Sequence, residues 1–296
     1  MKKVLILGGA GMLGHKMFQT LTDDRFDTYA TVRQAVEKSP AAAIGASSDG
    51  RFIGDVDVSD FGTVDALLDE IKPDVLVNCV GVIKQRDAAH DSMKSITINS
   101  LLPHLLAKKC GEIGGRVIHF STDCVFNGEK GAYEESDPSD AKDLYGRTKY
   151  LGEIYSPGSL TLRSSIIGRE LYNNASLIEW FLAQDGKKVR GFAKALYAGL
   201  TTNRMSVLVK DLILDHPDLS GMYQVSGPRI SKYDLLLLVR DAFELDIEIE
   251  RDEEVDIDRT LVGDRFSADT GFVAPSWLEM VTELAADPTP YESWKS

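Results

Sequence analysis

The chain is poor in cysteine and in long apolar runs. Its 296 residues include three cysteines, Cys79, Cys110 and Cys124, with no CxxC spacing. Three scattered thiols do not suggest a disulfide framework, and they suit a reducing cytoplasm. The first apolar run, residues 4–7, is too short for a signal-peptide core, and no stretch reaches the roughly 18 apolar residues of a membrane-spanning helix. The sequence therefore predicts a cytoplasmic protein without a membrane partner.

Positive charge is also scarce. Against 46 Asp and Glu stand 33 Lys and Arg, a net charge of -13. This balance argues against general binding of nucleic acid or of anionic membranes, although an anionic small ligand is allowed where basic residues gather locally. The five histidines form no HExxH pattern and there is no GxSxG elbow, so neither a metal site nor a serine-hydrolase site is expected.

The first half of the chain alternates between apolar strands and helices. This alternation predicts an α/β fold, a doubly wound parallel sheet of the Rossmann type over residues 1–165. Pro103 implies a kink in the helix that contains it. Residues 35–50 read as a surface loop. The expected strands are 3–7, 28–32, 51–56, 75–80, 117–120 and 160–163, and the expected helices are 11–21, 59–71 (capped by Ser59), 91–110 and 144–155.

After Ile167 the regular alternation of strands and helices changes. Apolar helical patches at 177–183, 207–214 and 233–243 alternate with short extended pieces, and residues 275–286 resemble a final amphipathic helix. We expect residues 166–296 to form a smaller mixed α/β substrate lobe, with segments that return to the first sheet. The charge run Asp252–Asp258 is expected to be a solvated loop.

A glycine-spaced turn connects the first strand to the first helix. Gly8, Gly11 and Gly14 allow a tight turn and a close approach of backbone amides to a pyrophosphate, with Met12 and Leu13 alongside the cofactor. A turn in this position predicts a dinucleotide site.

The ends of the next strands refine this prediction. The second strand ends at Arg33 without an acid, which favours the 2′-phosphate of NADP, while NAD stays open. Asp57 and Val58 follow the third strand, where they could frame an adenine edge. Asn78 and Gly81 end the fourth strand, where the backbone would face the cofactor ribose.

Tyr145 and Lys149 are four residues apart, so a helix places both on one face. An ammonium near a phenol lowers the phenol pKa, and such a tyrosine can pass a proton to a carbonyl that is being reduced. Thr122, 23 residues before Tyr145 at a strand end, could hydrogen-bond the same oxygen. We therefore predict Thr122, Tyr145 and Lys149 as catalytic residues.

With these pieces placed, the chain resembles the extended short-chain dehydrogenase/reductase superfamily and, within it, the dTDP-4-dehydrorhamnose reductase family. The resemblance spans nearly the whole chain and is most specific in its centre. It rests on Phe120-Ser-Thr-Asp-Cys-Val-Phe-Asn-Gly128, Tyr133-Glu-Glu135, Tyr145-Gly-Arg-Thr-Lys-Tyr-Leu-Gly-Glu153, Leu162-Arg-Ser-Ser165 and, more loosely, Asp264 to Trp277.

The resemblance implies reduction of the 4-keto group of a nucleotide-linked deoxysugar with NADPH or NADH, for cell-surface polysaccharide synthesis. It adds Asn99, Arg163, Ser164 and Ser165 to the residues expected at the cofactor and lets Lys149 hold the nicotinamide ribose. Since some relatives dimerise, a homodimer is a candidate assembly. For the diphosphate of the substrate, the candidates in the second half are Arg169, Arg204, Arg229 and Arg259.

Two segments, 80–86 and 191–204, depart from the rhamnose pattern, so both dTDP- and UDP-linked sugars stay open. Asp123 beside Thr122 keeps an epimerase or dehydratase of the same superfamily as an alternative. A further alternative is a non-catalytic subunit, because the family includes the regulatory beta subunit of methionine adenosyltransferase.

Overall fold

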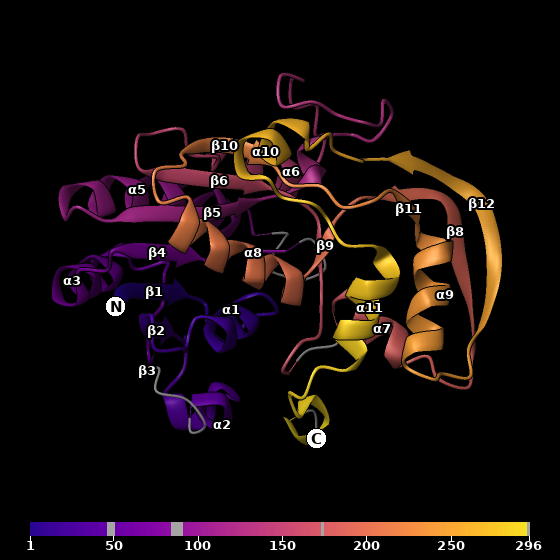
Figure 1. Cartoon of the computed structure of the whole chain (residues 1–296), viewed down its shortest axis with the longest axis horizontal. Coiled ribbons are helices and arrows are strands. Elements are labelled where there is room, and N and C mark those ends of the chain that lie inside the picture. The colour runs from indigo at the N-terminus through magenta and orange to yellow at the C-terminus, as the bar shows by residue number, and fades with distance from the viewer. Residues whose placement is uncertain (46–50, 84–90, 173–174, 295–296) are drawn as a thin grey trace. The chain divides into compact units, whose positions relative to one another are not determined.

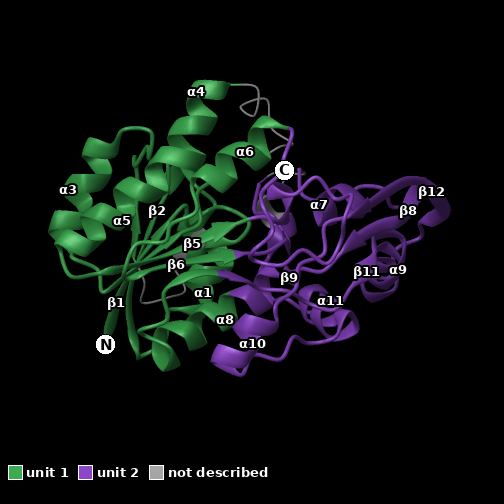
Figure 2. Ribbon diagram, turned by 90° about the horizontal axis from the view of Figure 1, so that it is seen from above, with its two compact units in different colours: residues 1–121, 143–162, 206–222 green, residues 122–142, 163–205, 223–296 purple. Residues whose placement is uncertain are grey.

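The computed structural model describes residues 1–45, 51–83, 91–172 and 175–294 (Figure 1). The chain forms two compact units, which Figure 2 colours separately. Unit 1 consists of Met1–Ser121, Asp143–Leu162 and Ser206–Met222, and unit 2 of Thr122–Lys142, Arg163–Met205 and Tyr223–Ser296. The roles of residues 1–165 as cofactor domain and of 166–296 as substrate lobe stay predictions.

A seven-stranded sheet has the strand order β10-β6-β5-β4-β1-β2-β3. The strand pairs from β5 through β4, β1 and β2 to β3 are parallel. The order runs outward from β1 in both directions, which is the arrangement of a doubly wound sheet, and this confirms the predicted fold class. The strands are β1 (Lys2–Leu7), β2 (Phe26–Thr31), β3 (Arg51–Ile53), β4 (Val75–Asn78), β5 (Arg116–Ser121), β6 (Ser159–Arg163) and β10 (Gly221–Gln224).

The central strands of this sheet are buried on both faces. Leu5 and Leu7 of β1, Leu76 of β4 and Val117 of β5 are fully buried in one apolar cluster. A parallel strand covered by helices on both sides needs apolar side chains on both sides, which explains the continuous apolar runs in the sequence.

The helices associated with this sheet begin close to the predicted positions. α3 is capped by Asp60, whose side chain accepts a hydrogen bond from the Gly62 amide, so the predicted cap at Ser59 is wrong by one residue. Residues 35–50, expected as a loop, contain a 3₁₀ turn and a short helix, and 46–50 lie outside the described residues. The elements are α1 (Gly14–Thr20), η1 (Val36–Lys38), α2 (Ala41–Gly45), α3 (Phe61–Ile71), α6 (Leu144–Leu151) and α8 (Thr202–Asp215).

The long helix predicted around Pro103 has three consecutive parts: α4 (Ser92–Ser95), the π-helical turn η3 (Ile96–Leu101) and α5 (Leu102–Glu112). Pro103 stands in the first turn of α5, directly after the π-helical turn. A π-helical turn thus interrupts the predicted helix just before Pro103, and a kink there stays a prediction.

Unit 2 contains a three-stranded sheet in the order β11-β8-β12 and a two-stranded sheet of β7 and β9. The long strands β8 and β12 pair parallel, and β11 pairs with β8 antiparallel. The elements are η4 (Asp123–Val125), β7 (Ile166–Ile167), α7 (Leu177–Leu182), β8 (Lys188–Tyr197), β9 (Leu200–Thr201), β11 (Ile230–Ser231), α9 (Lys232–Ala242), β12 (Glu248–Asp258), α10 (Asp264–Thr270), α11 (Trp277–Ala285) and η5 (Tyr291–Trp294).

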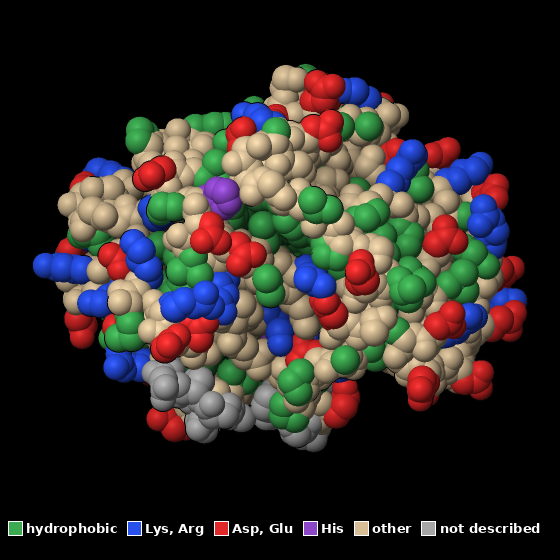
Figure 3. Space-filling model, in the orientation of Figure 1, with side chains coloured by type: hydrophobic (Ala, Val, Ile, Leu, Met, Phe, Trp, Pro, Cys, Tyr) green, Lys and Arg blue, Asp and Glu red, His purple; other side chains and the backbone are tan. Residues whose placement is uncertain are grey.

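The predicted loop at Asp252–Asp258 is wrong, because these residues continue the strand β12. Acidic side chains of β12 pair with cations of β8: Lys188 lies 3.1 Å from Glu248, and Arg190 contacts both Asp252 and Glu254. Figure 3 shows acidic and basic side chains interspersed over this edge. The charges that suggested a loop are therefore cross-strand pairs on an exposed edge strand.

No helix among the described residues combines the length and the apolar character that crossing a membrane requires.

Candidate active site

The glycine turn after β1 is closed by contacts that leave no room for side chains. Gly8 has a φ of 84°, in the left-handed region, and its carbonyl accepts a hydrogen bond from the Gly11 amide at 2.9 Å. A Cβ on Gly14 would lie 2.0 Å from the Gly8 carbonyl oxygen, so the first turn of α1 packs directly on the strand end. Between Gly11 and Gly14, Met12 is partly exposed and Leu13 is buried. The predicted dinucleotide-binding turn requires such close packing, and the binding itself stays a prediction.

The ends of β2 and β3 carry the residues predicted for the adenine side of the cofactor. Arg33 and Asp57 are exposed, whereas Val58 is buried. Hydrogen bonds from the amide and hydroxyl of Ser59 lower the pKa of Asp57, and the charge of Arg33 contributes a smaller lowering. The Asp57 carboxylate and the Arg33 guanidinium thus act on each other at this edge of unit 1.

Two buried asparagines hold the loop that follows β4. The Asn78 Oδ1 accepts from the Val80 amide at 3.1 Å, and its Nδ2 lies 3.1 Å from His119 Nδ1. Asn99, in the π-helical turn η3, accepts from the Val82 amide at 2.8 Å and donates to the Val82 carbonyl at 3.0 Å. A Cβ on Gly81 would lie 3.6 Å from Asn99 Oδ1. These contacts shape the backbone of the loop at residues 79–82, and residues 84–86 of the atypical segment lie outside the described part.

Tyr145 and Lys149 stand on α6, which Asp143 caps by accepting a hydrogen bond from the Gly146 amide at 2.8 Å. Tyr145 is partly exposed, whereas Lys149 is buried and its Nζ donates to the Phe120 carbonyl at 2.6 Å. Burial lowers the pKa of Lys149 to about 8, and the charge of Glu153 opposes this shift. A lysine with such a pKa is mostly an ammonium ion at neutral pH.

Thr122 belongs to unit 2 and follows the last residue of β5. Its Oγ1 accepts from the Cys124 amide at 3.2 Å and donates to Asp123 Oδ1 at 3.1 Å. The Thr122 hydroxyl thus caps the 3₁₀ turn η4, which fixes its side-chain direction.

The segment after β6 is held by main-chain contacts. Arg163 is buried with its guanidinium carbon 5.1 Å from the centre of the Phe126 ring. Ser164 donates to the Ser165 carbonyl at 3.2 Å, and that carbonyl also accepts from the Leu200 amide at 3.0 Å. The roles of Arg163, Ser164 and Ser165 at a cofactor stay predictions.

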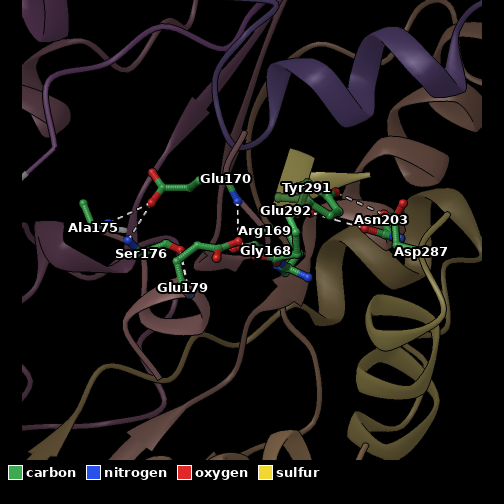
Figure 4. Close-up of polar contacts among 11 residues, drawn as sticks. Gly168, Arg169, Glu170, Ala175, Ser176, Glu179, Asn203, Asp287, Tyr291 and Glu292 are labelled. Atoms are coloured by element: carbon green, nitrogen blue, oxygen red, sulfur yellow. Dashed lines mark hydrogen bonds and ion pairs between the residues drawn. The ribbon is translucent and has the colours of Figure 1, made fainter. Parts of the chain in front are cut away.

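Arg169, the first of the four predicted diphosphate ligands, is deeply engaged within unit 2 (Figure 4). Its Nε donates to Glu179 at 2.6 Å and its Nη2 to Glu292 at 2.5 Å, and its guanidinium lies 4.5 Å from the centre of the Tyr291 ring. Glu179 also accepts from the Glu170 amide at 2.9 Å. The Arg169 side chain thus fastens the segment at 291–292 to the start of α7.

The other three arginines also have partners. Arg204 pairs with Glu283, Arg229 with Asp258 at 2.8 Å, and Arg259 donates to the Phe126 carbonyl at 2.8 Å. Binding of a diphosphate by any of the four stays a prediction, and each guanidinium would have to share or exchange its present partner.

The sequence reasoning missed the buried carboxylate of Glu153, which follows the helix of the predicted catalytic pair. Glu153 is 2% exposed, and its two oxygens accept hydrogen bonds from Ser121 at 2.6 Å and from Tyr155 at 3.0 Å. The signal was its spacing on the predicted helix 144–155, where Glu153 follows Lys149 by four residues, although α6 itself ends at Leu151. In the described ranges no three His, Cys, Asp or Glu side chains gather into a metal site.

Comparison with known proteins gives consistent results. A family model described as the RmlD substrate binding domain matches residues 1–246. The spore coat polysaccharide biosynthesis protein SpsK of Bacillus subtilis is 26% identical over 79% of this chain and 76% of its own. A dTDP-4-dehydrorhamnose reductase of Aggregatibacter actinomycetemcomitans is 25% identical over 81% and 79%. These matches confirm the resemblance that the sequence motifs indicated.

Two further relatives bear on the alternatives. The methionine adenosyltransferase 2 subunit beta of Xenopus tropicalis is 23% identical over 82% of this chain and 73% of its own. The structure of dTDP-4-dehydrorhamnose reductase from Bacillus anthracis in complex with NADP matches 98% of this chain and 100% of its own, with a TM-score of 0.79 at 19% identity. At this identity the structural likeness shows the shared fold.

Proposed function

The chain belongs to the RmlD substrate binding domain family, and from this premise we propose that it is an NADPH-dependent reductase of the short-chain dehydrogenase/reductase type. Its substrate is the 4-keto group of a deoxysugar linked to dTDP or UDP, and its product serves surface polysaccharide synthesis. The names of two relatives, a spore coat polysaccharide biosynthesis protein and a dTDP-4-dehydrorhamnose reductase, support this proposal. The three free cysteines suit action in a reducing cytoplasm.

The observation that carries the proposal is the Tyr145–Lys149 pair on α6. Lys149 is buried and anchored to the Phe120 carbonyl at 2.6 Å, which leaves two of its three ammonium protons for other partners. Its positive charge stabilises the phenolate of a nearby tyrosine and so lowers the barrier for proton transfer from that phenol. Tyr145 is the group on the same helical face that can supply the proton to the carbonyl oxygen.

Residues at the ends of the first four strands fit a dinucleotide. In the turn from Gly8 to Gly14 the backbone is packed so closely that added Cβ atoms would clash with the chain's own atoms. Glycine backbone of this kind also lets a pyrophosphate approach closely. When bound, NADPH supplies the hydride that the substrate carbonyl accepts. Arg33, exposed beyond β2, provides the positive charge for a 2′-phosphate. The Thr122 hydroxyl, whose oxygen accepts from the Cys124 amide, would exchange its present hydrogen bond to Asp123 for one to the substrate oxygen as negative charge develops there.

The test is the consumption of NADPH, followed by its absorbance, with a panel of dTDP-4-keto-6-deoxysugars and UDP-2-acetamido-4-keto-6-deoxysugars. We expect turnover with one class, and a loss of about 100-fold or more in kcat for Tyr145→Phe. The matched control is Tyr150→Phe on the same helix, whose side chain is exposed and whose loss should leave kcat unchanged. NADPH binding without turnover of any 4-ketosugar contradicts the proposed reductase.

A specific relative favours a second candidate, a non-catalytic subunit. The methionine adenosyltransferase 2 subunit beta spans most of this chain at 23% identity. Under this alternative the protein binds NADPH, shows no turnover and co-purifies with a partner enzyme.

An epimerase or dehydratase is the third candidate, favoured by the Asp123 carboxylate next to Thr122, and it would retain its cofactor through purification.

We also propose a homodimer. α6 packs on η3 through hydrogen bonds such as that from Ser100 to the Thr148 carbonyl at 2.9 Å. On these helices and the adjoining α4, Met93, Leu101 and Leu151 are 75%, 50% and 61% exposed. A second copy would cover these apolar side chains. Sedimentation should show a dimer that Leu151→Ser converts to a monomer.

A further inference from the structure

The segment at residues 287–292 is fastened within unit 2 at two places (Figure 4). Asp287 accepts hydrogen bonds from Asn203 Nδ2 at 3.0 Å and from the Tyr291 hydroxyl at 3.2 Å. Tyr291 and Glu292 both contact the guanidinium of Arg169. The match to the family model ends at residue 246, so the family model does not account for these contacts.

Arg169 holds two carboxylates that differ in burial. Glu179, 2.6 Å from Arg169 Nε, has a side chain that is 1% exposed, whereas Glu292, 2.5 Å from Nη2, has one that is 79% exposed. A buried cation requires a charge partner, and Glu179 supplies it. Water solvates the Glu292 carboxylate when it leaves, so its ion pair contributes little. The Glu292 contact is therefore the exchangeable one of the two.

Tyr291 fixes the guanidinium independently of Glu292. Its side chain is 3% exposed, and its ring centre lies 4.5 Å from the guanidinium carbon of Arg169. A guanidinium stacked on an aromatic ring keeps its plane, while its N–H groups point outward along that plane. Burial of the Tyr291 ring makes detachment of the whole segment costly. Rotation of the Glu292 side chain alone opens Nη2 and leaves the stacked arrangement intact.

The N–H groups of a guanidinium bind carboxylate and phosphate oxygens with the same geometry. Arg169 follows Ser165 by four residues that include the extended β7, so at most about 13 Å separate the two along the chain. Ser165 is one of the residues that we place at the nicotinamide. A sugar whose C4 carbonyl lies there carries its diphosphate at C1, across the ring, and so directs it away from the nicotinamide.

We propose that Glu292 is an internal competitor for the diphosphate of the substrate: its carboxylate occupies Arg169 Nη2 in the free protein and is displaced when a nucleotide sugar binds. The identity of this ligand rests on the proposed function. After the exchange, Glu179 and Tyr291 still hold Arg169 in place. Loss of the Glu292 charge therefore tightens binding of the ligand without removing its binding group.

The first test measures binding without turnover. Isothermal titration with UDP and with dTDP gives the Kd of each for wild type and for Glu292→Gln. We expect a Kd about three- to fivefold lower in Glu292→Gln, the range that an exposed ion pair contributes. An unchanged Kd in Glu292→Gln overturns the proposal, and so does a failure of both nucleotides to bind either protein.

The matched control for this titration is Glu254→Gln. Glu254 also pairs with an arginine, Arg190, and its side chain is 81% exposed, so the variant removes an equivalent charge at another place in unit 2. Its Kd for UDP and dTDP should equal that of wild type. An equal gain in both variants would mean that any loss of negative charge favours the anion, and would overturn the competition at Arg169.

A double-mutant cycle connects the effect to Arg169. Arg169→Lys keeps a cation for Glu179 but lacks the fork of N–H donors, and in this background Glu292→Gln should leave Kd unchanged. A gain that persists there would place the action of Glu292 elsewhere and overturn the proposal. Should Arg169→Lys fail to fold, the comparison of Glu292→Gln with Glu254→Gln decides alone.

Inorganic phosphate distinguishes the two sources of a phosphate ligand. We expect the gain in Glu292→Gln with UDP and dTDP, whose diphosphate is held by the rest of the nucleotide. A gain with inorganic phosphate and none with either nucleotide would mean that Arg169 takes a free anion, and would overturn the assignment to the substrate.

The reductase assay gives the catalytic consequence. In Glu292→Gln the KM for the 4-ketosugar nucleotide should fall about three- to fivefold with little change in kcat, because the contact is made alike in the ground and transition states. Tighter UDP or dTDP binding without turnover of any 4-ketosugar would contradict the proposed reductase and leave the competition supported. Turnover with unchanged KM and Kd would overturn the competition alone.

Discussion

The parallel sheet of unit 1 and the β8–β12 pair of unit 2 are built on opposite principles. In unit 1, the apolar strands that contain Leu5 and Leu76 are buried on both faces of the sheet. Along β12, by contrast, most side chains are exposed, and acidic residues pair with Lys188 and Arg190 on the next strand. Both pairings are parallel, although the register of β8 with β12 shifts between Asp252 and Asp256, so strand direction does not distinguish them. The first depends on burial of apolar surface and the second on charge pairing over an exposed ladder.

The largest expected effect on the free energy of unfolding concerns the turn after β1. Gly14→Ala places a Cβ 2.0 Å from the Gly8 carbonyl oxygen, and the backbone of the strand end must move. We expect a loss of about 4 kcal/mol in the free energy of unfolding and NADPH binding at least about tenfold weaker. The matched control is Gly111→Ala in α5, where nothing lies within 4 Å of the new Cβ. Urea unfolding and NADPH fluorescence titration measure both variants; equal stability of the two would contradict close packing of this turn.

A truncation in each sheet tests the difference in burial. Leu76→Ala in β4 removes a side chain with no exposed surface and should lower the free energy of unfolding by about 3 kcal/mol. Val255→Ala in β12, where the side chain is 37% exposed, should cost less than about 1 kcal/mol. Denaturant midpoints at constant m-value give both numbers. Similar losses in the two variants would mean that β12 is buried more deeply than its exposure indicates.

Charge pairing predicts a smaller, salt-dependent effect in the β8–β12 pair. Arg190→Ala leaves the buried carboxylate of Asp252 without its cation, and we expect a loss of about 1 kcal/mol. Lys188→Ala, whose partners Glu248 and Glu250 are exposed, should change the free energy of unfolding clearly less than Arg190→Ala does. In about 1 M salt the Lys188 effect should vanish, while most of the Arg190 effect remains. A Leu76→Ala effect that changed with salt in the same way would remove the distinction between the two sheets.

This comparison also explains which elements could be predicted. The strands around Leu5 and Leu76 were found because an uninterrupted apolar run has few other structural solutions. β12 was read as a loop at Asp252–Asp258, since a run of charges is typical of solvated segments and only the cations of β8 make it a strand. Pro103 indicated a break in its helix, but the π-helical turn that carries Asn99 could not be foreseen.

For the candidate site, the spacing of residues along the chain predicted much of the local geometry. The tight turn at Gly8 and Gly14, and the common face of Tyr145 and Lys149, depend on contacts within a few residues, so the sequence by itself determined them. Only the tertiary structure decided that Lys149 donates to Phe120, that Glu153 is buried against Ser121, and that Arg169 holds Glu179 and Glu292. Those partners lie 10 to 123 residues apart in the chain, and which of them meet depends on how strands and helices pack, information that no local periodicity contains.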